Sequence, residues 1–150
     1  MYSFNDLDDI NEQLIPLKIM ADKELASVRG LNGLVFTPHF DEYMKVCIKK
    51  AEILRFLKNT NLMPLSPVEV ISADLEQLYK RTQNNAVVEY KGNSYQRRFT
   101  PLKLSKSGKN VQKWAKFWLL QQDNGDINSD WEQQIKEIWP QYFLIRSILI

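Results

Sequence analysis

The chain has 150 residues, of which 44% are hydrophobic and 25% charged, and it carries a net charge of +2 at pH 7. These values are typical of a globular protein and exclude disordered, collagen-like and low-complexity classes. The single cysteine and single histidine exclude a disulfide framework, a cysteine-based zinc site and a histidine-cluster metal site. At this length we expect one globular domain, residues 1–150.

The first residues of the chain and the lengths of its apolar runs indicate where in the cell the protein is expected. The first residues are acidic rather than basic, unlike those of a signal peptide. No apolar run approaches the roughly 18 residues that cross a bilayer. With one cysteine and no export signal, we expect a cytoplasmic protein with no membrane partner.

Apolar residues at helical spacing predict three helices in the first half of the chain, over residues 3–28, 37–59 and 66–82. Each begins at a recognisable cap, and the third has a complete capping box with a proline at its first position. We expect Pro16 to kink or split the first helix, because proline lacks the backbone N–H that a helix interior uses.

From about residue 86 the spacing of the apolar residues changes from that of a helix to that of a strand. Residues 86–99 predict a β-hairpin whose two runs are separated by a three-residue loop, Lys91-Gly92-Asn93. Residues 102–104 predict a third short strand after Pro101. We therefore expect a small antiparallel sheet near residues 86–104.

The C-terminal third is expected to be mainly helical. Residues 111–121 predict a helix that ends at Asn124-Gly125, and Ser129 can cap another helix that stops near Pro140. Residues 142–150 are mostly apolar, and period alone does not decide between a buried strand and a short core helix. The predicted fold class is α+β, with about five helices and the small sheet.

Charge is distributed unevenly along the chain. The 33 residues from Tyr90 through Gln122 contain eight basic residues and no acidic one, so the remainder of the chain sums to −6. Aromatic residues are interleaved with these cations. A surface that binds nucleic acid needs cations for phosphates and flat faces for bases.

We therefore expect a nucleic-acid contact surface on the hairpin and on the helix predicted to follow it. Arg97 and Arg98 offer forked guanidinium groups to phosphates, and three of the lysines share one face of the predicted helix. Tyr95 and Trp114 are candidates for base stacking. The full candidate set is Lys91, Tyr95, Arg97, Arg98, Lys103, Lys106, Lys109, Lys113, Trp114 and Lys116.

Two other interpretations of the basic segment stay open. A run of like charges is often only a solvated surface, and strand alternation places Arg97 and Arg98 on opposite faces. An acidic protein is a second class of anionic partner. The chain would then act as an adaptor, using the basic surface and the apolar residues 142–150 within a larger complex or a homo-oligomer. Whether residues 142–150 are core or interface also stays open.

The sequence offers little for catalysis. His39 and Cys47 lie on one predicted helix, eight positions and therefore about 12 Å apart along its axis, which excludes a Cys–His dyad. There is no phosphate-binding loop, dinucleotide fingerprint or nucleophile elbow. We expect a non-catalytic protein with no cofactor, no metal and no catalytic residues.

One constellation supports a remote alternative. Glu89-Tyr90-Lys91 is an E-x-K triplet with Asp74 fifteen residues before the glutamate. It resembles the D…E-x-K pattern of restriction-endonuclease-like nucleases. The resemblance rests on these residues alone and implies that Asp74 and Glu89 hold Mg²⁺ while Lys91 positions the attacking water. The favoured prediction remains an accessory protein that binds the backbone of DNA or RNA.

Overall fold

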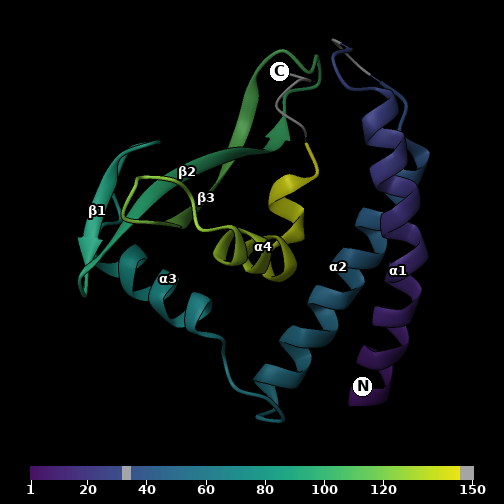
Figure 1. Ribbon diagram of the computed structural model, residues 1–150, viewed down its shortest axis with the longest axis horizontal. Coiled ribbons are helices and arrows are strands. Elements are labelled where there is room, and N and C mark those ends of the chain that lie inside the picture. The colour runs from purple at the N-terminus through teal and green to yellow at the C-terminus, as the bar shows by residue number, and fades with distance from the viewer. Residues whose placement is uncertain (32–34, 146–150) are drawn as a thin grey trace.

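The computed structural model describes residues 1–31 and 35–145 (Figure 1). These ranges contain four α-helices, a short 3₁₀ helix and a three-stranded antiparallel sheet. In chain order the elements are α1 (Phe4–Ser27), α2 (Pro38–Asn59), α3 (Pro67–Leu78), β1 (Val87–Tyr90), β2 (Asn93–Leu104), β3 (Val111–Gln121), α4 (Ser129–Ile138) and η1 (Pro140–Phe143). The predicted α+β class is confirmed, with one helix fewer than expected.

Helix α1 begins at the expected capping box, in which the Ser3 side chain accepts from the backbone of Asp6 and the Asp6 carboxylate accepts from the backbone of Ser3. The helix continues past Pro16, so of the expected kink or split at this residue the split does not occur. Apolar residues on both sides of Pro16, including Ile10 and Leu17, pack against α2. This packing holds both halves of α1 against α2 although Pro16 has no backbone N–H for an internal hydrogen bond.

Helix α2 begins at Pro38, as predicted, but Thr37 makes no side-chain cap. The cap is supplied from α1, where the Glu24 carboxylate accepts from the backbone N–H groups of His39 at 3.0 Å and Phe40 at 2.9 Å. A carboxylate at this position also interacts favourably with the positive end of the helix dipole. Glu24 therefore ties the two helices together at one end of their antiparallel pair, which forms its own apolar cluster.

The turn between β1 and β2 has two residues rather than the three that were predicted, because Tyr90 pairs directly with Asn93. Lys91 and Gly92 both have positive φ, at 49° and 82°, as a type I′ turn requires. Strand β2 also continues through Pro101 to Leu104, so there is no separate strand over residues 102–104. Strand β1 does not reach Pro101, so the missing N–H of the proline costs no ladder bond on that side.

The largest difference from expectation is β3, which was predicted as a helix. It pairs with β2 from Ser94↔Gln121 to Leu104↔Val111, and alternate residues such as Ala115, Phe117 and Leu119 are buried. A long ladder with a central strand outweighs the weak local preference of this segment for helix. The lysines predicted to share one helix face are therefore distributed over a ribbon and its loop.

The main core lies between the sheet, α3 and α4. Trp118 of β3 contacts Tyr79 next to α3, and its backbone oxygen accepts a hydrogen bond from the Trp131 indole of α4 at 2.8 Å. On β2, the Thr100 hydroxyl donates to the backbone oxygen of Tyr142 at 2.7 Å. Buried members of this core are Val68, Leu75, Tyr95, Phe117, Trp118, Leu119, Trp131 and Ile135.

The end of the chain is described as far as residue 145. Tyr142 and Phe143 belong to the 3₁₀ helix η1 and pack against Phe117, so the start of this stretch is a short helix against the core rather than a strand. Residues 146–150, and with them most of the question whether 142–150 is core or interface, lie outside the described residues. None of the helices in residues 1–31 and 35–145 has the length and apolarity that crossing a bilayer requires.

Candidate nucleic-acid interface

The outer parts of β2 and β3, with the loop between them, form a two-stranded ribbon over residues 99–116, which we call the ribbon arm. Figure 1 shows this end of the two strands extending away from α3. The connecting loop is closed by a backbone bond from Ser105 N to Asn110 O at 2.8 Å, and Gly108 turns it with a φ of 72°. The most basic segment of the sequence thus lies on a hydrogen-bonded two-stranded ribbon.

All five lysines of the ribbon arm are exposed, and none takes part in an ion pair within the described residues. Lys103 lies directly opposite Lys113 across the ladder. Like charges in directly opposed positions destabilise a sheet, so this pair raises the positive potential at a cost in stability. An anion bound between them removes that cost. The five residues are Lys103, Lys106, Lys109, Lys113 and Lys116.

Two aromatic rings accompany Lys116 on one face of the ribbon arm. Trp114 is 45% exposed, and its ring lies 6.4 Å from that of Phe99. The Lys116 ammonium group lies 5.0 Å from the centre of the Phe99 ring, within cation–π range. Because Phe99 pairs with Lys116 across the ladder, only the strand register brings this group together. Phe99 was not among the predicted site residues.

Arg97 does not belong to this surface. Its side chain is completely buried, and both terminal nitrogens donate to the Glu76 carboxylate of α3, one of them at 3.1 Å. The guanidinium carbon lies 4.6 Å from the centre of the Trp118 ring. The hydrogen bonds from Arg97 are the main cause that lowers the pKa of Glu76 below its usual value. Arg97 is therefore a core residue rather than a phosphate contact.

Two other predicted residues, Tyr95 and Lys91, also lie away from the ribbon arm, and a third, Arg98, directly precedes it. Tyr95 is 2% exposed and packs against Trp131, so its ring is not available to a base. Lys91 lies in the turn at the opposite end of β2, with its ammonium group over the Tyr90 ring. Arg98 is half-buried, and its Nε donates to Gln96 at 2.8 Å. The structure thus brings together six of the ten candidates, the five lysines and Trp114.

The nuclease-like constellation does not converge in the structure. The Tyr90 hydroxyl donates to the Asp74 carboxylate at 2.6 Å. Glu89, the preceding residue of β1, lies on the opposite face of the strand and is exposed. Among the described residues there is no group of three or more His, Cys, Asp or Glu side chains that could hold a metal ion.

His39 and Cys47 stay separate, as their spacing on one helix predicts. His39 is exposed in the first turn of α2, and Cys47 is half-buried two turns further along. Burial raises the pKa of the Cys47 thiol, although a hydrogen bond with the Tyr43 side chain acts in the opposite direction. A raised thiol pKa lowers the thiolate fraction at neutral pH and therefore the reactivity of the cysteine.

The chain was compared with protein-family models, with curated proteins and with solved structures, and none of the three comparisons found a match.

Proposed function

We propose that this protein is a non-catalytic nucleic-acid-binding protein that binds backbone phosphates through the lysines of its ribbon arm. The observation that carries the proposal is a set of five exposed lysines on one ribbon, none of them in an ion pair with a described residue, with Lys103 opposite Lys113. A structural role does not require two like charges to face each other. Binding of a polyanion compensates for their repulsion.

The shape of the ribbon arm suits a duplex. The major groove of B-form DNA admits a two-stranded β-ribbon. Lys113 and Trp114 are adjacent on β3 and so lie on opposite faces of the ribbon, while Lys106 and Lys109 lie in the loop at its tip. Cations on both faces and at the tip can meet phosphates on both walls of the groove. The exposed Trp114 offers a stacking surface if the strand is single instead.

The test is fluorescence anisotropy with labelled duplex DNA, single-stranded DNA and RNA over a salt series. In a plot of the logarithm of the association constant against the logarithm of the salt concentration, each phosphate contact on duplex DNA makes the slope more negative by about 0.9. We expect the double variant Lys106→Gln, Lys109→Gln to make the slope less negative by about 1.8. The matched control is Lys23→Gln, Lys45→Gln, which removes two exposed lysines from α1 and α2.

Two results contradict the proposal. One is a lack of binding at about 50 mM salt, where phosphate contacts are strong. The other is an equal change of slope in the control variant, which would mean that overall charge rather than the ribbon arm determines binding.

A second candidate partner is an acidic protein segment, and the outer edge of β3 favours it. Near Trp118 this edge is covered, because Trp131 and Asn128 donate to the backbone oxygens of Trp118 and Leu120. At Lys116 the backbone groups point away from β2, and no described residue forms a hydrogen bond with them. An extended acidic peptide can add there as a strand. Binding of a labelled poly-glutamate peptide without binding of any nucleic acid would favour this partner.

A further inference from the structure

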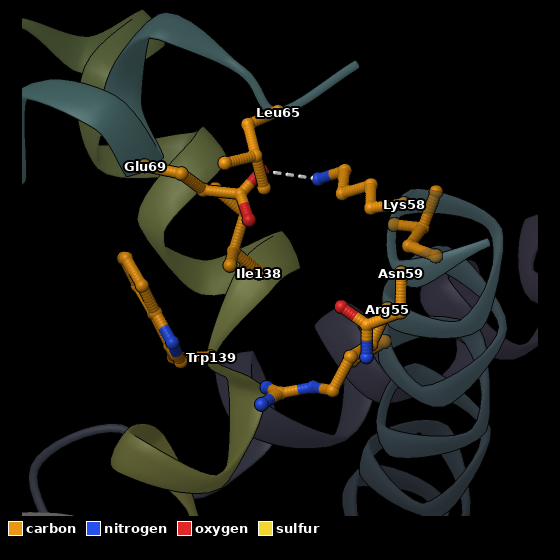
Figure 2. Close-up of a pocket in the computed structure, with 9 residues that line it drawn as sticks. Arg55, Lys58, Asn59, Leu65, Glu69, Ile138 and Trp139 are labelled. Carbon is orange, nitrogen blue, oxygen red and sulfur yellow. Dashed lines mark hydrogen bonds and ion pairs between the residues drawn. The ribbon is translucent and has the colours of Figure 1, made fainter. Parts of the chain in front are cut away.

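A cavity of about 330 Å³ lies between α2 and the end of α4, away from the ribbon arm (Figure 2). This volume is in the range of small-molecule sites. Its lining combines apolar side chains with a few polar ones, as such sites do. The lining residues are Ala51, Leu54, Arg55, Lys58, Asn59, Leu65, Glu69, Ile138 and Trp139.

One uncompensated positive charge faces this cavity. Arg55 and Asn59 are one helical turn apart on α2, and Figure 2 shows both side chains projecting into the cavity. Within the described residues Arg55 takes part in no ion pair, whereas Lys58 is paired with Glu69. Both members of that pair are largely buried, with side chains 8% and 16% exposed. The pair is neutral, so the charge that remains is that of the Arg55 guanidinium.

The wall opposite Arg55 is aromatic. Figure 2 shows the Trp139 ring edge-on, with one face toward the cavity. Tyr142 stacks on the same indole, with ring centres 5.9 Å apart and planes 8° from parallel, and it does not line this cavity. The stacking fixes the orientation of Trp139 and leaves a flat surface for another ring. Ile138 and Leu65 extend the apolar part of the wall.

We propose that this cavity binds a small aromatic carboxylate, with its ring on Trp139 and its carboxylate on Arg55. The guanidinium fork matches a carboxylate with two parallel hydrogen bonds. One free cation balances one negative charge, which favours a monoanion over a phosphate ester. Asn59 lines the same cavity, and its amide N–H groups are suited to donate a further hydrogen bond to the ligand. This site is independent of the nucleic-acid proposal.

The test uses 2-naphthoate as the probe and 2-naphthylmethanol as its uncharged counterpart. A titration followed by ¹H–¹⁵N NMR should move the Trp139 indole signal and the Asn59 side-chain signals. Arg55→Gln should weaken 2-naphthoate binding about tenfold or more, because hydrogen bonds between charged groups are stronger than those between neutral groups. It should leave 2-naphthylmethanol binding nearly unchanged. Arg81→Gln, at an exposed arginine outside the lining, is the matched control.

The proposal is overturned if neither Trp139 nor Asn59 responds at about 10 mM 2-naphthoate, ten times the dissociation constant of a millimolar ligand. It is also overturned if Arg55→Gln and Arg81→Gln weaken binding equally, or if Arg55→Gln weakens both compounds equally. Spectra of the free variants check that each one is folded. The double variant Lys106→Gln, Lys109→Gln should bind 2-naphthoate normally, so this test and the nucleic-acid test fail separately.

Discussion

The Arg97 side chain is held in the core by a carboxylate that is itself only half-buried. Glu76 accepts hydrogen bonds from the Arg97 guanidinium and from the Trp118 indole, the latter at 3.3 Å, while its own side chain is 47% exposed. A buried charge without a partner is strongly unfavourable. At the scale of single residues, Glu76 is therefore the group that makes Arg97 tolerable between the sheet and α3.

We expect Glu76→Gln to lower the free energy of unfolding at pH 7 by about 1–2 kcal/mol. Loss of one partner of a fully buried ion pair costs about 3–5 kcal/mol, and solvent around Glu76 reduces that value. Because the pKa of folded Glu76 is lowered, its contribution is complete above the unfolded value near 4.3 and disappears as the pH falls through the folded value. The difference in the free energy of unfolding between the wild type and Glu76→Gln should therefore become smaller below about pH 4.

Urea denaturation at several pH values between about 3 and 8 measures this difference. Glu89→Gln, at an exposed glutamate of β1, is the control and should change stability by less than about 0.5 kcal/mol. A difference that stays constant down to the lowest pH would mean that the Glu76 carboxylate contributes through its shape rather than its charge.

At the scale of elements, the ribbon arm combines a structural cost with a surface suited to anions. Its strands are paired up to Leu104↔Val111, but the register shifts on both sides of Lys103. This irregular part of the ladder is also where Lys103 faces Lys113. Stability and the proposed binding therefore make opposite demands on position 103, and one substitution can separate the two effects.

We expect Lys103→Glu to raise the free energy of unfolding by about 0.2–1 kcal/mol, because a like-charge pair becomes an opposite-charge pair. The same change should weaken duplex binding and make its salt slope less negative by about 0.9. Urea denaturation and anisotropy measure the two effects on the same samples. Lys45→Glu, on an exposed face of α2, controls for net charge. Stabilisation with unchanged binding would remove Lys103 from the interface.

At the scale of the whole molecule, the described residues form two apolar clusters, and the first has more buried residues than the second. The first joins the sheet to α3 and α4, and the second lies between α1 and α2. In Figure 1, α1 lies on the outer side of α2, away from the sheet. Only Ile10 and Ala21 of α1 are buried. Helix α1 therefore contributes to the second cluster and not to the core of the sheet.

We expect the backbone amides of α1 to exchange with solvent hydrogen at a lower opening free energy than the paired amides of β2 and β3. Regions with few buried apolar contacts open locally, whereas core strands exchange only in global unfolding. Hydrogen exchange followed by NMR under native conditions measures both sets in one sample. Equal opening free energies across α1 and the sheet would show instead that the chain unfolds as one cooperative unit.

Residues close together in the sequence were sufficient to predict where the helices begin and where the first hairpin lies. The capping box of Ser66 and Glu69, and Pro38 at the first position of α2, lie where they were predicted. The strands on either side of Gly92 were predicted too, although the turn is shorter than expected. These features depend on residues only a few positions apart, so a short stretch of sequence contains the information that determines them.

Tertiary structure alone decided that residues 111–121 form a strand, that Arg97 is buried and that Lys103 faces Lys113. Each of these depends on pairing or packing with a distant part of the chain. Arg97 is adjacent to Arg98 in sequence and is equally basic, yet Glu76, 21 residues away, makes it a core residue. The sequence by itself determined where the basic residues are concentrated. The register of β3 on β2 decided which of them face one another across the ribbon arm, because opposition across a ladder is not encoded in local spacing.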